Sequence, residues 1–243
     1  MENNIKRHTF LKSIVLHLLP GLLVGCFYFA ITPFVKEHGY PSVMALILAG
    51  IFVLIPFELG FLLYQKRLKG GKLFNGVLKY CQHIPLWQYF VWVPIVSASI
   101  GLIFTVLNFT SDFLLTFFDW IPQNLHLDMG LSQEFSNHKL IITYASFFIF
   151  IVLVLPASEE LYFRGYLLPR MPAKLKGWTA IVHSSLFALY HVWTPWMFVV
   201  RAVGMLPLIY VVRRKNIYLG IIIHCLMNSI DFFIALVFIL NYN

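Results

Sequence analysis

The chain has 243 residues, of which 60% are hydrophobic and only 12% are charged, and its mean hydropathy is +0.79. Soluble domains carry about 25% charged residues, so this composition excludes a soluble protein and predicts an integral membrane protein. A net charge of +8 would indicate an acidic partner in a soluble protein, but here the predicted topology explains it. The three cysteines are too widely spaced to indicate a disulfide framework or a zinc ligand set.

Seven apolar segments approach the roughly 20 residues that a membrane-spanning helix needs. They cover about residues 13–34, 43–64, 88–109, 142–168, 177–193, 195–212 and 217–240. No A-x-A-like cleavage site follows the first segment, so we expect a retained helix and not a signal peptide. The fifth and sixth segments meet at Thr194 and Pro195, which predicts a tight helical hairpin with Pro195 in a first helical turn. The amphipathic stretch 110–120 is expected to lie on the membrane surface or to form an eighth, partial span.

The expected fold is therefore an all-α, polytopic bundle that forms a single membrane domain over residues 1–243. Lysine and arginine in short loops mark the cytosolic side of such a bundle. The basic positions fall in segments 6–12, 66–79, 170–176 and 213–215. The opposite side carries only Lys36 and Lys139, which predicts a cytosolic N-terminus and an external C-terminus. The basic loops are interpreted as anchors for anionic lipid, and the short loops favour a bacterial plasma membrane.

Polar side chains within the predicted spans form three clusters, and ionisable groups inside a membrane indicate a functional site by default. The clusters are Glu159-Glu160-x-x-x-Arg164, Phe187-x-x-x-His191 and His224-x-x-x-Asn228. Residues four apart share a helix face, so Glu160 is expected to pair with Arg164. Glu159 points about 100° away from that face. We therefore expect Glu159 to remain free to take a proton.

The depth of each cluster in the membrane provides an independent indication that they meet. With about 1.5 Å of rise per residue, Glu159 lies roughly 14 Å above the cytosolic end of its helix. His191 lies roughly 20 Å and His224 roughly 10 Å above theirs, with Asn228 in between. An ordinary helix tilt of about 20° absorbs these differences. The sequence therefore predicts that all four side chains converge in the cytosolic half of the bilayer.

Such a site has the groups needed to hydrolyse an amide. Glu159 would act as general base toward a water molecule, with His191 sharing or relaying the proton. His224 and Asn228, one helical turn apart, would both donate hydrogen bonds to a developing oxyanion. Pro156 precedes Glu159 by three residues and is expected to kink the helix and open space for water.

The motifs EELYFR, FALYH and HCLMN, in this order, resemble those of the type II CAAX prenyl endopeptidase family. These intramembrane glutamic proteases also include bacteriocin-processing and immunity homologues (CPBP, ABI). The resemblance covers about residues 150–230 and implies that the catalytic motifs lie there. It further implies metal-independent hydrolysis. The implied water activators are Glu159 and His191, the implied transition-state stabilisers are His224 and Asn228, and the implied supporting residues are Glu160 and Arg164. Phe187 is interpreted as packing below His191 and shaping the pocket wall.

Several alternatives to this interpretation stay open at the level of sequence. Nitrogen and oxygen ligands for zinc exist in Glu159, Glu160, His191 and His224, although the chain has no H-E-x-x-H motif. Serine (G-x-S-x-G) and aspartyl (G-x-G-D) protease motifs are absent. A non-enzymatic immunity factor or membrane scaffold is the main rival, and a proton-moving transporter is a third possibility. The expected partner is a membrane-associated or lipid-anchored peptide or protein, and no nucleic acid is expected.

Four further buried polar positions receive weaker predictions. Arg201 and Asp231 are placed at similar depth by helix rise and are predicted to form a structural ion pair, although Asp231 would alternatively orient the site. Glu58 is expected to face the same cavity without an identifiable partner. His183 shares a helix face with Phe187 and is interpreted as structural.

Overall fold

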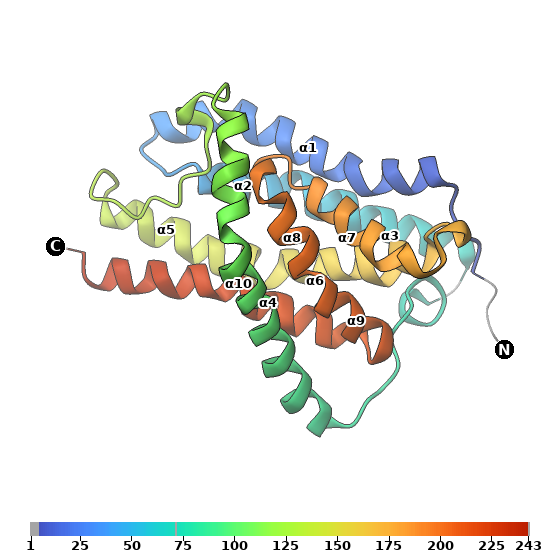
Figure 1. Ribbon diagram of the computed structural model, residues 1–243. Coiled ribbons are helices and arrows are strands. Elements are labelled where there is room, and N and C mark those ends of the chain that lie inside the picture. The colour runs from blue at the N-terminus through green and yellow to red at the C-terminus, as the bar shows by residue number, and fades with distance from the viewer. Residues whose placement is uncertain (1–4, 71, 243) are drawn as a thin grey trace.

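The computed structural model describes residues 5–70 and 72–242, and within these ranges every regular element is a helix (Figure 1). The α-helices are α1 (Phe10–Glu37), α2 (Val43–Ala49), α3 (Ile55–Lys69), α4 (Leu86–Leu115), α5 (Asn137–Phe147), α6 (Leu155–Glu159), α7 (Thr179–Leu189), α8 (Phe198–Gly204), α9 (Leu206–Arg214) and α10 (Ile217–Leu240). π-Helical segments join several of them: η1 (Gly50–Leu54), η2 (Leu73–Val77), η5 (Phe148–Val154) and η6 (Glu160–Leu167). Short 3₁₀ segments are η3 (Thr116–Phe118), η4 (Gln123–Leu125), η7 (Leu168–Arg170), η8 (Ala173–Trp178) and η9 (Pro195–Met197).

Six helical stretches of the described residues are long and apolar enough to cross a membrane, one fewer than the seven predicted. They are Phe10–Glu37, Val43–Lys69, Leu86–Phe118, Asn137–Arg170, Pro195–Arg214 and Ile217–Leu240. The predicted fifth span is wrong in length, because α7 has only 11 residues. At 1.5 Å per residue it is about 16 Å long, against the roughly 30 Å of hydrocarbon in a bilayer.

The stretches Leu86–Phe118 and Pro195–Arg214 test two other sequence predictions. The amphipathic segment 110–120 forms neither a separate surface helix nor an eighth span, because most of it continues α4 and η3 as far as Phe118. Pro195 occupies the first turn of η9, as predicted. Between α7 and η9, the chain turns over residues 190–194, and this turn ends α7.

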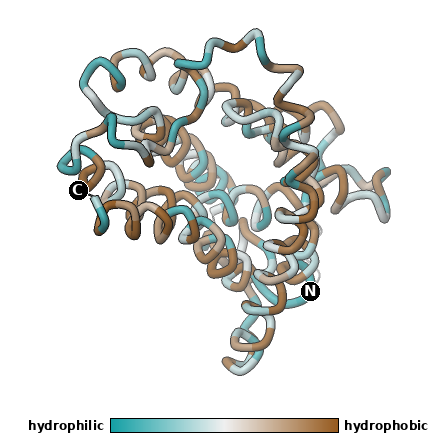
Figure 2. Tube along the Cα trace, turned by 60° about the vertical axis from the view of Figure 1, so that its left-hand side comes forward, coloured by the Kyte–Doolittle hydropathy of each residue, from teal (hydrophilic) through white to brown (hydrophobic). Residues whose placement is uncertain are grey.

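The helices present hydrophobic residues along most of their length, as Figure 2 shows. α4 crosses α8 and α10 obliquely and contacts both (Figure 1). Many large apolar side chains on its outer surface are exposed, including Trp87, Phe90 and Phe109. In an apolar span, these side chains are the expected contacts with lipid. Asn216 caps the start of α10, since its side chain accepts a hydrogen bond from Leu219 N.

A proline-associated distortion shapes the fourth span next to the glutamate pair. Leu155 N–H donates to Phe150 O, five residues back, as in a π-helix. The next donor in this series would be Pro156, which has no N–H. Ile151 O is thereby left without its helical partner and accepts a hydrogen bond from Asn228 Nδ2 at 2.9 Å. The disturbance expected at Pro156 thus takes the form of a π-helical turn that ties α10 to the fourth span.

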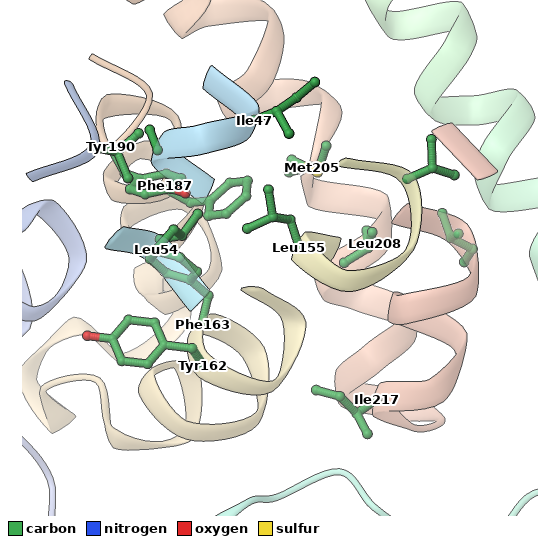
Figure 3. Close-up of a cluster of buried hydrophobic side chains, with 14 of the residues drawn as sticks. Ile47, Leu54, Leu155, Tyr162, Phe163, Phe187, Tyr190, Met205, Leu208 and Ile217 are labelled. Carbon is green, nitrogen blue, oxygen red and sulfur yellow. The ribbon is translucent and has the colours of Figure 1, made fainter. Parts of the chain in front are cut away.

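The second span contains the same distortion, a π-helical turn followed by a proline. Ile55 N–H donates to Gly50 O, five residues back, and Pro56 follows. The two distorted regions pack together, because a Cβ on Gly50 would lie only 2.6 Å from a methyl carbon of Leu155. Glycine therefore permits this close approach without displacement of the Leu155 side chain. Aromatic side chains complete the core beside it, where Phe163 of η6 lies 4.9 Å from Phe187 between ring centroids (Figure 3).

Candidate active site

One cavity of about 480 Å³ lies among the helices and is lined by all four side chains predicted to converge. Glu159 lies at the end of α6, His191 follows α7, and His224 and Asn228 lie on α10. The sequence motifs and the approximate helix rise predicted this meeting of three chain segments. Phe187 also lines the cavity, as expected for a residue of its wall. Much of the remaining lining is apolar, with contributions from α2, α4 and α5.

The Glu159 carboxylate faces two partners from different helices. Its side chain is almost fully buried, and its Oε1 accepts a hydrogen bond from Tyr190 Oη at 2.7 Å. Its Oε2 lies 3.6 Å from His224 Nε2. The hydroxyl therefore fixes one carboxylate oxygen, while the other is directed toward the imidazole.

Glu160 lies behind this pair and is fully buried. Its Oε1 lies 3.2 Å from Arg164 Nη1, which confirms the predicted pairing along the helix. The same oxygen lies 3.0 Å from His224 Nδ1. A Cβ on Gly220 would lie 2.9 Å from the other oxygen of Glu160, so this glycine lets α10 approach the carboxylate closely.

Arg164 is held by an aromatic ring as well as by its carboxylate. Its guanidinium carbon lies 3.8 Å from the centroid of the Phe187 ring, a favourable cation–π geometry. The guanidinium is fully buried. Phe187 therefore has two roles, because it supports the buried cation and forms part of the cavity wall.

His224 bridges the two glutamates through its two ring nitrogens. A carboxylate only accepts hydrogen bonds, so the contact with Glu160 assigns the Nδ1 proton to His224. Nε2 is then the nitrogen that faces Glu159 and the cavity. This arrangement fixes the orientation of the imidazole in the way that carboxylates orient histidines at other active sites.

His191 is oriented by a backbone carbonyl. Its Nδ1 lies 2.9 Å from Phe187 O, and because a carbonyl only accepts, Nδ1 carries the proton. The free Nε2 lone pair is therefore available to accept from a water molecule. The ring packs against Tyr190 and Trp193, with centroids 4.6 and 5.1 Å away.

Tyr190 is the site residue that sequence reasoning missed. It is fully buried, and its ring lies 5.0 Å from that of Phe163 and 5.7 Å from that of Phe187 (Figure 3). A tyrosine in an apolar segment is usually explained by packing, which hid its hydrogen bond to Glu159. The available indication was its position directly before His191 at the end of α7.

The contacts of Glu58, His183 and Arg201 show the outcome of the weaker predictions. Glu58 does not line the cavity, which corrects the expectation, because its Oε2 accepts a hydrogen bond from Ser158 Oγ at 2.6 Å. His183 Nδ1 lies 2.9 Å from His17 Nε2, a buried contact in agreement with a structural role. The predicted pair of Arg201 and Asp231 is not formed, since Arg201 Nη1 instead binds Thr194.

The described residues hold no group of three or more histidine, cysteine, aspartate or glutamate side chains arranged to bind a metal ion.

Together, the helices and the cavity define a polytopic membrane protein with a buried carboxylate and imidazole site. Residues 141–230 match the family model described as Type II CAAX prenyl endopeptidase Rce1-like. This segment contains all three polar motifs, so the resemblance noted in the sequence is confirmed over it. The match and the six apolar helices support a membrane protease. No curated protein matches the chain, and no solved structure does.

Proposed function

We propose that this protein is an intramembrane endopeptidase that hydrolyses a peptide bond with a water molecule activated by Glu159 and His191. The observation that carries the proposal is the meeting of Glu159, His191, His224 and Asn228 at one cavity. The match to an endopeptidase family over the segment that supplies all four residues supports the same reaction.

Water activation would use the two acceptors that the surrounding contacts leave available. His191 Nε2 is free because Nδ1 is bound to Phe187 O, and Glu159 Oε2 is directed away from Tyr190. The water oxygen attacks the carbonyl carbon while its proton passes to Glu159. When the C–N bond breaks, that proton is delivered to the leaving amine, and the carboxylate is restored.

The negative charge that develops on the carbonyl oxygen would be held by His224 and Asn228. Nδ2 of Asn228 has two N–H groups, and one of them is bound to Ile151 O. The second is available to the substrate. His224 Nε2 faces the cavity and donates to the oxyanion when it carries a proton. Donors fixed in advance at the position of developing charge are the usual basis of oxyanion stabilisation.

Glu160 and Arg164 would act as supporting residues and not as reacting groups. Their ion pair keeps a negative charge next to His224 Nδ1, which fixes the ring with Nε2 toward the substrate. Neither residue lines the cavity.

The proposed substrate is a membrane-associated or lipid-anchored peptide or protein. The apolar lining of the cavity and its position among membrane spans favour such a substrate over a soluble one. We place the enzyme in a bacterial plasma membrane with the cavity open to the cytosol, on the basis of the loop charges.

The test is cleavage of a pooled library of lipidated peptides by detergent-purified protein in the presence of a chelator. We expect wild type to cleave and Glu159→Gln to be inactive, with size-exclusion profiles that show both to be folded. Cleavage that the chelator abolishes would instead assign Glu159 to a metal site. Absence of cleavage by folded wild type would favour the immunity or scaffold alternative.

A further inference from the structure

Arg201 of α8 lines the same cavity as the proposed catalytic residues. One nitrogen of its guanidinium, Nη1, donates to Thr194 O at 3.1 Å and to Thr194 Oγ1 at 2.8 Å. Both contacts come from the turn that also carries His191. The side chain is therefore anchored at one end next to the site, and its orientation is fixed.

The rest of the guanidinium has no acceptor within residues 5–70 and 72–242. Nη2 and Nε make no hydrogen bond there, and no carboxylate lies within salt-bridge distance. Asp231, the partner that depth in the membrane predicted, lines the cavity without pairing with Arg201. A cation in a membrane span with no carboxylate in direct contact is costly and is a functional-site hypothesis by default. This cation faces the space that a substrate must occupy.

We propose that Arg201 binds a carboxylate of the substrate. A guanidinium presents a planar fork of donors that matches the two oxygens of a carboxylate. Thr194 occupies one side of that fork and leaves the Nε and Nη2 donors for the ligand. This inference rests on the proposed endopeptidase function and narrows its substrate to peptides that bring a carboxylate to the scissile bond. The carboxylate is either the free C-terminus or an acidic side chain.

Three forms of one palmitoylated, fluorescent octapeptide pool test the proposal and separate the two sources. The first ends in a free acid, the second in an amide, and the third in an amide with one internal glutamate. We expect wild type to prefer at least one carboxylate form over the plain amide by about tenfold or more in kcat/KM, mainly through KM. A preference for the first form identifies the C-terminus, and a preference for the third identifies a side chain.

The ratio between peptide forms serves as an internal control for folding. In Arg201→Gln, the preference should fall to near one, whereas Arg201→Lys should keep part of it because the charge remains. Asp231→Asn, the matched change of the cavity's other unpaired charge, should keep the full preference. An equal rate for all forms with wild type, or an unchanged preference in Arg201→Gln, would overturn the proposal.

Binding distinguishes a failure of this inference from a failure of the proposed function. The same peptides are titrated into Glu159→Gln protein, and their affinities are compared with those for the variant that also carries Arg201→Gln. Tighter binding of a carboxylate form that depends on Arg201 supports the inference even if wild type cleaves nothing. Equal affinities in both proteins contradict it even if cleavage is observed.

Discussion

The second and fourth spans contain the same local distortion, a π-helical turn followed by a proline, but their glutamates face different surroundings. Each has a π-helical turn, a proline and then a buried glutamate. Glu58 follows Pro56 by two residues, and Glu159 follows Pro156 by three. One residue is about 100° of helix rotation. Glu58 is thereby directed to Ser158 in the core, whereas Glu159 faces the cavity.

Burial of a carboxylate is therefore not sufficient to place it at the candidate site. Both glutamates lie at similar distances after a proline, and both are buried. They differ in access to the cavity and in the presence of an imidazole, since His224 lies beside Glu159 and no described histidine makes an ion pair or hydrogen bond with Glu58.

The largest effect is expected from neutralising each glutamate in turn. Glu159→Gln should lower kcat by about 10²–10⁴, because it removes the proposed general base. The matched change Glu58→Gln keeps a side-chain oxygen that accepts the hydrogen bond from Ser158. It should lower kcat by less than about tenfold, which is below the range expected for loss of a general base. Initial cleavage rates of folded protein provide the measurement. A loss in Glu58→Gln as large as that in Glu159→Gln would remove the distinction between the two spans.

Arg164→Met should destabilise the protein by about 3–5 kcal/mol, because it leaves the buried Glu160 charge without its cation. Thermal unfolding in detergent measures the loss. Arg170→Met is the matched control, since Arg170 is also buried and stacks on an aromatic ring, Tyr166, at 3.9 Å, but its hydrogen bonds are to backbone carbonyls. Its expected loss is smaller, and an equal loss would argue against an ion-pair role.

Tyr190→Phe should lower kcat by about tenfold with little change in KM, because hydrogen bonds to charged groups contribute about 1.5–3 kcal/mol. Loss of this donor makes the ionised form of Glu159 less favourable, so the acid limb of the pH–rate profile should move to higher pH. Tyr162→Phe is the control, because this equally buried hydroxyl donates to Leu16 O at 2.7 Å, away from the site. A shift of the acid limb in both variants, or in neither, would contradict a positioning role for Tyr190.

The smallest effect is expected from restoring the missing backbone donors. Pro156→Ala supplies an N–H that competes with Asn228 for Ile151 O, so kcat should fall roughly 2- to 12-fold, the equivalent of about 0.5–1.5 kcal/mol. Pro56→Ala supplies the corresponding N–H in the second span, where no described side chain uses the freed carbonyl, and should leave the rate unchanged. Steady-state kinetics of the two variants provide the measurement. Equal effects of the two substitutions would show that Pro156 does not act through the hydrogen bond of Asn228 to Ile151 O.

The sequence predicted that Glu159, His191, His224 and Asn228 converge, and all four line one cavity. Helix rise was only an approximate guide, because His191 lies in a turn after α7 and the fourth span contains π-helical segments. Depth does not specify the direction of a side chain around its helix. Arg201 and Asp231 illustrate this limit, since their similar depths predicted an ion pair that is not formed.

The helix count was wrong by one span because the sequence does not show where α7 ends. The predicted fifth span, residues 177–193, included residues 190–193, which lie in the turn that ends α7. Tyr190 lies in that turn, and its hydrogen bond to Glu159 depends on a tertiary contact across 31 residues. No periodicity in the sequence reports such a contact.

In the proposed reaction, Glu159 activates water and does not itself attack the peptide. A single turnover in ¹⁸O-labelled water, with unlabelled enzyme in excess over peptide, distinguishes these two roles of the carboxylate. Our account predicts one ¹⁸O atom in the new C-terminal carboxylate of the product and none in Glu159, as measured by mass spectrometry. Product without label, together with ¹⁸O in the Glu159 carboxylate, would show a covalent acyl intermediate and contradict the account.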